Sequence, residues 1–125
     1  PQEIDKINIL QARMEGFRRA IDILAKKTGA TYAVIDGNKK PEGLILETDY
    51  LVKGDEKLAC ISAASILAKV TRDRLMIEQA KLYPNYGFEK HKGYLTKDHL
   101  EALKQYGPCG IHRLTYKPVK DSIKV

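Results

Sequence analysis

Residues 31–41 read TYAVIDGNKKP, and this stretch sets the expected fold because an apolar run ends in an acidic residue where the chain turns. The run Tyr32–Ile35 is rich in β-branched and aromatic residues, which predicts a buried strand. Asp36 follows directly, just before Gly37 and Asn38. Because Asp-Gly is also ordinary turn chemistry, Asp36 is either a turn residue or one half of a metal site.

A second apolar run ends in the same way. Tyr50–Val52 predicts another strand that leads into Lys53-Gly54-Asp55, and Leu44–Leu46 is a candidate short extended piece. If the two strands are neighbours, Asp36 and Asp55 meet at one edge of the sheet, although they are 19 residues apart. Close carboxylates repel each other unless a cation lies between them, and oxygen ligands favour Mg²⁺ or Mn²⁺.

Helical periodicity flanks these strands. Apolar residues recur at three- and four-residue steps over residues 7–24, which predicts a helix that Gly29 ends. A second helix is predicted from about Cys60 to Tyr83, and a short one from about Lys97 to Gln105 with Thr96 as its N-cap. The order helix, strand, strand, helix predicts an α/β fold with a parallel strand pair.

The composition describes an ordinary globular chain. Its 125 residues suit one domain, with 43% hydrophobic and 30% charged residues. The sequence contains no run of 18 or more apolar residues, so we expect no membrane span, and no signal peptide is recognisable. The chain begins with Pro1 rather than Met, which suggests a fragment or a processed product.

Positive charge gathers in the C-terminal third. The net charge is +6, and from Lys81 onward nine Lys and Arg face four Asp and Glu, which accounts for +5. The loop Tyr86–Tyr94 interleaves aromatic, basic and glycine residues. Such a region is either a merely basic surface or a nucleic-acid contact, and we favour nucleic acid. Aromatic rings can stack on sugars or bases and lysine neutralises phosphate, so the residues of this loop, Lys92 and His91 among them, are candidate contacts.

The remaining reactive side chains indicate structure rather than chemistry. Cys60 and Cys109 read as reduced thiols, with Cys60 in the core, although the sequence leaves a single disulfide open. The three histidines share no ligand spacing, which disfavours a zinc site. Asp73 lies between two arginines within the long predicted helix, where a structural ion pair is expected.

Several long motifs together resemble the bacterial ribonuclease HII family. These motifs span almost the whole chain in the family's order: EIDKINILQARMEGFRRAI, VIDGN, KGD, ISAASILAKVTRDRLM, YPNYGFEKHKGYLTKDHLEAL and GPCGIHR. The resemblance implies a ribonuclease H-like α/β fold, a mixed sheet flanked by helices with a helical C-terminal part. It also implies a metal-dependent endonuclease that cuts RNA in RNA–DNA hybrids, and single ribonucleotides in duplex DNA, on the 5′ side of the ribonucleotide.

The resemblance further implies roles for particular residues. The family holds Mg²⁺ or Mn²⁺ with four acidic residues, and two of these match Asp36 and Asp55, which would therefore be catalytic metal ligands. Tyr94 matches the tyrosine that stacks on the deoxyribose after the ribonucleotide. The Arg-Asp pair of the long helix is a family motif as well, but Asp73 is not one of the four acids.

This sequence departs from the family pattern in two places. It has no Asp-Glu-Ala-Gly-Arg-Gly segment, which in the family supplies the other two acids, and Leu95 stands where the family usually has glycine. We therefore expect residues 1–125 to be a partial catalytic domain that lacks the N-terminal strands. About residues 1–82 would form the sheet and helix core, and about 83–125 a substrate-contacting part.

We therefore expect the parent enzyme to be cytoplasmic and monomeric, and we expect the present chain to be inactive on its own. Two rival interpretations stay open. One is a non-catalytic, basic fragment that binds nucleic acid without cutting it. The other is a folding remnant whose unpaired sheet edge drives self-association.

Overall fold

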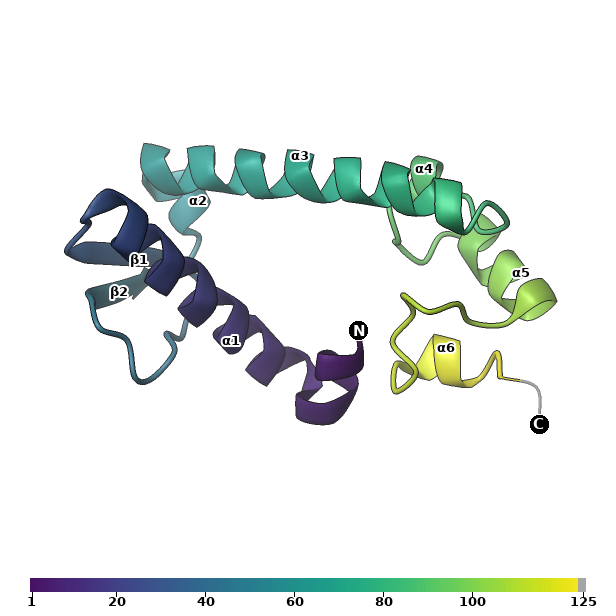
Figure 1. Ribbon diagram of the computed structural model, residues 1–125. Helices are drawn as coiled ribbons and strands as arrows, with labels where there is room; N and C mark the ends of the chain where they lie inside the picture. The colour runs from purple at the N-terminus through teal and green to yellow at the C-terminus, as the bar shows by residue number, and fades with distance from the viewer. Residues whose placement is uncertain (124–125) are drawn as a thin grey trace. The chain divides into compact units, whose positions relative to one another are not determined.

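The computed structural model describes residues 1–123, in which a single parallel pair of strands is preceded and followed along the chain by helices (Figure 1). The elements in chain order are α1 (Gln2–Thr28), β1 (Tyr32–Asp36), β2 (Glu47–Leu51), α2 (Gly54–Lys57), α3 (Ala59–Leu82), α4 (Phe88–His91), α5 (Lys97–Tyr106) and α6 (Lys117–Lys120). This mixture of helices and parallel strands is consistent with the predicted α/β class.

The chain divides into two compact units. The strand unit comprises residues 7–67, and the C-terminal unit joins residues 1–6 to the residues from 68 onward. The two long helices, α1 and α3, contribute residues to both units. No helix among residues 1–123 combines the length and the apolar character that crossing a membrane requires.

The strands of the strand unit pair in parallel, as predicted, from Tyr32 opposite Glu47 to Asp36 opposite Leu51. The second strand nevertheless starts earlier than its apolar residues suggested, and Val52 lies beyond the pairing. The expected extended piece at Leu44–Leu46 is not a strand. The reason is that pairing with β1, rather than apolar character, selects the strand residues.

Helix α1 follows its apolar periodicity and ends where predicted. Gly29 adopts a left-handed φ of 69°, and its N–H donates to the carbonyl of Ala25 at 2.9 Å, which caps the helix. The helix is interrupted at Asn8, whose φ is 67°. The side-chain oxygen of Asn8 accepts the N–H of Gln11 at 3.0 Å, so Asn8 acts as an N-cap for the longer segment that follows.

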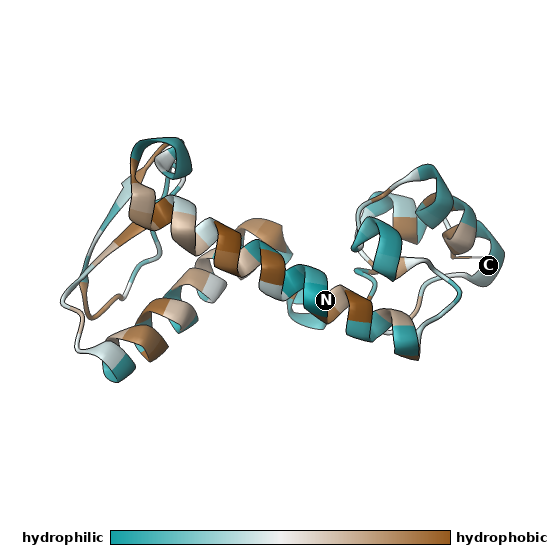
Figure 2. Cartoon of the chain, turned by 90° about the horizontal axis from the view of Figure 1, so that it is seen from above, coloured by the Kyte–Doolittle hydropathy of each residue, from teal (hydrophilic) through white to brown (hydrophobic). Residues whose placement is uncertain are grey.

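Helix α3 buries little of its apolar surface. Ile61 is its buried residue, at 5% exposure, whereas Leu67 is 70% exposed. Figure 2 shows brown, apolar segments along both α1 and α3. Cys60, expected in the core, is exposed instead, because successive residues point about 100° apart around a helix and Ile61 takes the inward position. Cys60 and Cys109 are both free thiols, as expected.

The C-terminal unit contains the larger apolar cluster. Phe88 and Leu103, each 1% exposed, lie at its centre, and helix α5 contributes one apolar face to it. That helix begins as predicted, since the hydroxyl of Thr96 accepts the N–H of His99 at 3.3 Å. The unit therefore has a packed core, and the Tyr94 side chain next to it stays exposed.

The first turn of α1 belongs to this unit through a polar contact. The Asp5 carboxylate accepts the backbone N–H groups of Leu114 and Thr115, at 3.0 and 3.1 Å, and the Thr115 hydroxyl at 2.7 Å. These hydrogen bonds, the hydroxyl first, hold the pKa of Asp5 below its usual range. The N-terminal turn is thus joined to the segment after α5 by one side chain.

Candidate functional site

Asp36 occupies the last position of β1 and reaches across to the start of the next helix. Its Oδ1 accepts the backbone N–H of Gly54 at 2.9 Å. Directly behind it, the N–H of Gly37 donates to the carbonyl of Leu51 at 3.0 Å and continues the pairing of the strands. The half-buried carboxylate is therefore fixed at the carboxyl edge of the sheet, which is the edge that the sequence predicted.

Asp55 lies one residue beyond that hydrogen bond, in the first turn of α2, and its side chain is exposed. The chain reverses into α2 through Lys53, whose φ of 53° is left-handed. A Cβ added to Gly54 would lie 2.6 Å from the Cδ1 of Ile61 and 3.6 Å from the Cα of Asp36. This close approach brings the backbone that carries Asp55 against the end of β1.

The two aspartates carry the donor atoms that a hard cation prefers, but two side chains are too few to fill its coordination shell. Their donors are carboxylate oxygens, the ligands of Mg²⁺ and Mn²⁺, and these ions take about six ligands. One oxygen of Asp36 already accepts a backbone N–H. Within residues 1–123, no group of three or more His, Cys, Asp or Glu side chains is arranged to hold a metal ion. The pair could supply part of a coordination shell that water and phosphate oxygens complete.

Tyr94 presents its ring to solvent while polar contacts hold its backbone. The side chain is 68% exposed, and the guanidinium of Arg72 lies 5.6 Å from the ring centroid. Arg72 also donates to the carbonyl of Lys92 at 2.7 Å. Gly93, with a φ of 90°, passes so close to α3 that an added Cβ would lie 3.3 Å from Met76. An exposed aromatic ring on an anchored loop can stack on a ligand with little loss of entropy.

The other two predicted contact residues differ in their surroundings. Lys92 is half-buried, and its ammonium donates to the carbonyl of Glu89. His91 is buried, its Nε2 lies 2.6 Å from the carbonyl oxygen of Tyr86, and its Nδ1 accepts the N–H of Gly93 at 3.1 Å. Both ring nitrogens of His91 thus serve the backbone of its own loop, and direct contact with nucleic acid stays a prediction.

The structure gathers the three histidines that their spacing left unconnected. The rings of His91 and His99 stack with centroids 4.3 Å apart, and the Nε2 atoms of His99 and His112 lie 2.9 Å apart. All three rings are buried. His99 shares a helical face with Ala102 and Leu103, three and four residues on, and this periodicity was the available signal that it points into the core.

Asp73 forms an ion pair, as expected, although its partner is Lys69 rather than a neighbouring arginine. The Lys69 ammonium lies 2.8 Å from Oδ2, and this hydrogen bond is the main cause of a lowered Asp73 pKa. The two residues are four positions apart on α3, where facing side chains attract each other but solvent screens the attraction. We therefore interpret Asp73 as a charged residue on the surface of α3 that is paired with Lys69.

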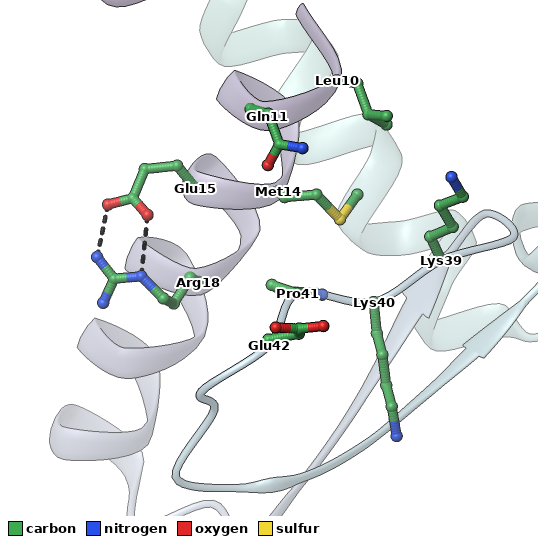
Figure 3. Close-up of a pocket in the computed structure, with 9 residues that line it drawn as sticks. All are labelled: Leu10, Gln11, Met14, Glu15, Arg18, Lys39, Lys40, Pro41 and Glu42. Carbon is green, nitrogen blue, oxygen red and sulfur yellow. Dashed lines mark hydrogen bonds and ion pairs between the residues drawn. The ribbon is translucent and has the colours of Figure 1, made fainter. Parts of the chain in front are cut away.

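A pocket of about 500 Å³ lies elsewhere in the strand unit, between α1 and the loop after β1. Figure 3 shows Met14 facing Pro41 across it, with the ion pair of Glu15 and Arg18 on one side. This pair, together with Arg19, lowers the pKa of Glu15 to about 2. None of the predicted site residues lines this pocket, so we assign it no role.

The comparisons with known proteins agree on one family. The model of the family "Ribonuclease HII" matches residues 2–119. The chain belongs to the ribonuclease HII family. It is 58% identical over 120 residues to ribonuclease HII of Endomicrobium trichonymphae, covering 96% of this chain and 56% of that protein. Over 126 residues it is 52% identical to that of Polynucleobacter necessarius, covering 99% and 64%.

The extent of the match is as informative as the identity. Natranaerobius thermophilus ribonuclease HII is 49% identical over 122 residues, covering 98% of this chain and 60% of that protein. The chain thus spans less than two thirds of the length of these curated relatives. The resemblance noted in the motifs is confirmed, and Asp36, Asp55 and Tyr94 all lie within the matched range of the ribonuclease HII model.

Arg72 offers a direct test of how the Tyr94 loop is held. Replacing Arg72 by Lys keeps the charge but removes the guanidinium that bridges the Lys92 carbonyl and the Tyr94 ring. We expect the free energy of unfolding, measured by urea titration, to fall by about 1 kcal/mol. Arg74→Lys, on the same helix, is the control and should change nothing measurable. Equal effects of the two substitutions would contradict the bridging role.

The histidine cluster predicts how stability depends on pH. Burial, then the proximity of His99, lowers the pKa of His112 to about 4 from its ordinary 6.5, and burial lowers that of His99. The ring of His91 and the thiol of Cys109 face the same pair. Below about pH 6.5 these histidines are protonated in the unfolded chain but stay neutral in the folded chain. The free energy of unfolding should therefore decline as the pH falls towards about 4.

Urea unfolding at several pH values between about 7 and 5.5 would measure the first part of this decline, above the range in which most carboxylates titrate. The same series on His112→Gln should give a shallower dependence, because one ring with a lowered pKa has been removed. A stability that stays constant over this range in the wild-type chain would contradict the assignment.

Proposed function

We propose that this chain carries part of the active site of a metal-dependent endonuclease that cuts RNA in RNA–DNA hybrids and single ribonucleotides embedded in duplex DNA. Cleavage would occur on the 5′ side of the ribonucleotide. The observation that supports this most directly is the hydrogen bond from Gly54 to Asp36, because it holds the residue that precedes Asp55 against the Asp36 carboxylate at the sheet edge. Membership of the family gives the reaction class.

In this proposal Asp36 and Asp55 are the catalytic residues and hold Mg²⁺ or Mn²⁺ through carboxylate oxygens. A divalent cation bound by these carboxylates would supply activation of a water and stabilisation of the leaving oxygen. The role of Gly54 is to orient the Asp36 carboxylate before any cation arrives, because its N–H fixes one of the two oxygens. Asp55, exposed in the first turn of α2, can adjust its side chain to the ligand geometry.

Substrate contact is proposed for the loop that carries His91, Lys92 and Tyr94. The exposed ring of Tyr94 would stack on the deoxyribose that follows the ribonucleotide. Lys92 uses one N–H on the Glu89 carbonyl and, since an ammonium has three, can offer others to phosphate. His91, whose ring is buried, would act through the shape of the loop or through its backbone.

The same proposal covers the larger organisation. β1 and β2 would be strands of a ribonuclease H-like mixed sheet, with about residues 1–82 as core and about 83–125 as the part that meets the substrate. The enzyme would act in the cytoplasm as a monomer.

The 125-residue chain assayed alone should not cleave a duplex that contains one ribonucleotide, even with Mn²⁺ present. Two carboxylates provide too few ligands to hold two cations beside a charged phosphate. The measurement is product formation on a denaturing gel, with an intact curated relative as the positive control. Robust metal-dependent cleavage by the chain alone would overturn this expectation.

A basic binding module is the rival function, favoured by the exposed Tyr94 ring and the net charge of +6. Anisotropy titrations of a labelled hybrid duplex at rising salt would distinguish the two. Binding that weakens with salt, with no cation effect and no change on Asp36→Asn, would favour the module. An apparent mass that rises with protein concentration in sedimentation experiments would instead favour the self-associating folding remnant.

Metal binding can be tested without any cleavage. Mn²⁺ broadens nearby NMR signals, so we expect the amides of Gly37, Gly54 and Asp55 to lose intensity first. Asp36→Asn keeps an oxygen that can accept the Gly54 N–H but removes the charge, and should weaken the broadening severalfold. Asp49→Asn is the matched control, because Asp49 lies on β2 but bonds the Tyr32 hydroxyl. Broadening centred elsewhere would contradict the site.

A further inference from the structure

The buried histidines form a chain of hydrogen bonds whose direction one backbone group decides. The N–H of Cys109 donates to Nδ1 of His112 at 2.9 Å, and the Cys109 thiol lies 3.1 Å from the same nitrogen. A backbone amide can only donate, so Nδ1 of a neutral His112 carries no proton. The proton of that ring is therefore on Nε2.

The tautomer of the second ring follows from the first. Nε2 of His112 lies 2.9 Å from Nε2 of His99, and since His112 donates there, His99 accepts. The proton of His99 is then on Nδ1, which lies 2.9 Å from the carbonyl oxygen of Tyr94. The chain of donors runs from Cys109 through both rings and ends on the backbone of Tyr94.

The surroundings keep this pair neutral and in place. His99 and His112 are 3% and 8% exposed. The ring of Phe88 meets both of them edge-on or tilted, at 5.5 and 5.7 Å between centroids, and His91 stacks on His99. A second proton on His99 would face the Nε2–H of His112, and a second proton on His112 would face the N–H of Cys109, each across 2.9 Å. The pair has no acceptor to spare for an added proton.

We propose that His112 and His99 position Tyr94 for substrate by fixing its carbonyl through this hydrogen-bonded pair, a role that rests on the proposed contact between Tyr94 and the duplex. Tyr94 is then held on two sides. Its carbonyl is tied to the buried pair, and its exposed ring is met by Arg72 at 5.6 Å. His91 has a different task, since its nitrogens bind the backbones of Tyr86 and Gly93.

The tautomers can be read directly, without substrate. Long-range ¹⁵N–¹H NMR of the wild-type chain near neutral pH should show the proton of His112 on Nε2 and that of His99 on Nδ1. Reversed tautomers, or a doubly protonated ring, would overturn the pair. This measurement does not depend on the proposed function of the chain.

The positioning role requires coupling to Tyr94, which a merely structural role would not give. His112→Phe keeps an aromatic ring but removes the donor to His99. We expect it to weaken binding of a duplex with one ribonucleotide, measured by anisotropy, by about fivefold. In a Tyr94→Ala background the same substitution should have no further effect. Val119→Ala is the control, a core change that lowers stability without affecting binding.

The outcomes separate the two levels of inference. Equal effects of His112→Phe with and without the Tyr94 ring would overturn the positioning role while leaving Tyr94 as a contact. No effect of Tyr94→Ala on binding would overturn the proposed contact, and the positioning role with it. If His112→Phe does not fold, the wild-type tautomers still test the pair.

Discussion

The hydrogen bond between the Asp36 carboxylate and the Gly54 N–H is the contact on which the strand unit depends. It closes the parallel pairing at the edge where β1 ends, and it joins that edge to the start of α2. Gly54 has no room for a side chain on the side of Ile61, so the strand end, α2 and the first turn of α3 meet at one residue. A carboxylate placed here has a structural partner before it has any ligand.

Tyr94 shows the same principle in the C-terminal unit. Its ring stays exposed, and the atoms that hold it are backbone carbonyls tied by Arg72 and His99 rather than an apolar pocket. An aromatic ring buried in a core would be well ordered but inaccessible to a sugar. Anchoring through the backbone instead gives order and access together, which the proposed contact of Tyr94 with a duplex would require.

Sequence reasoning succeeded where a periodic pattern and a local cap coincide, and failed where contacts are long-range. Gly29 and Thr96 mark helix ends because each makes a hydrogen bond within four residues. Strand β2 was misplaced because its residues 47–49 are polar and become a strand through pairing with β1. The pair of His99 and His112 depends on two segments meeting in the core, and no spacing rule encodes that.

The two aspartates differ in a way that bears on the proposed chemistry. Asp36 is half-buried and oriented by Gly54, whereas Asp55 is exposed at the start of a four-residue helix. A fixed carboxylate sets where a cation binds, and a mobile one can follow the ligand shell as phosphate and water enter it. Because a backbone N–H already binds Asp36 and the ring of His99 already binds the Tyr94 carbonyl, both positions are organised in the absence of ligand. Binding would then cost less ordering entropy than it would on a free loop.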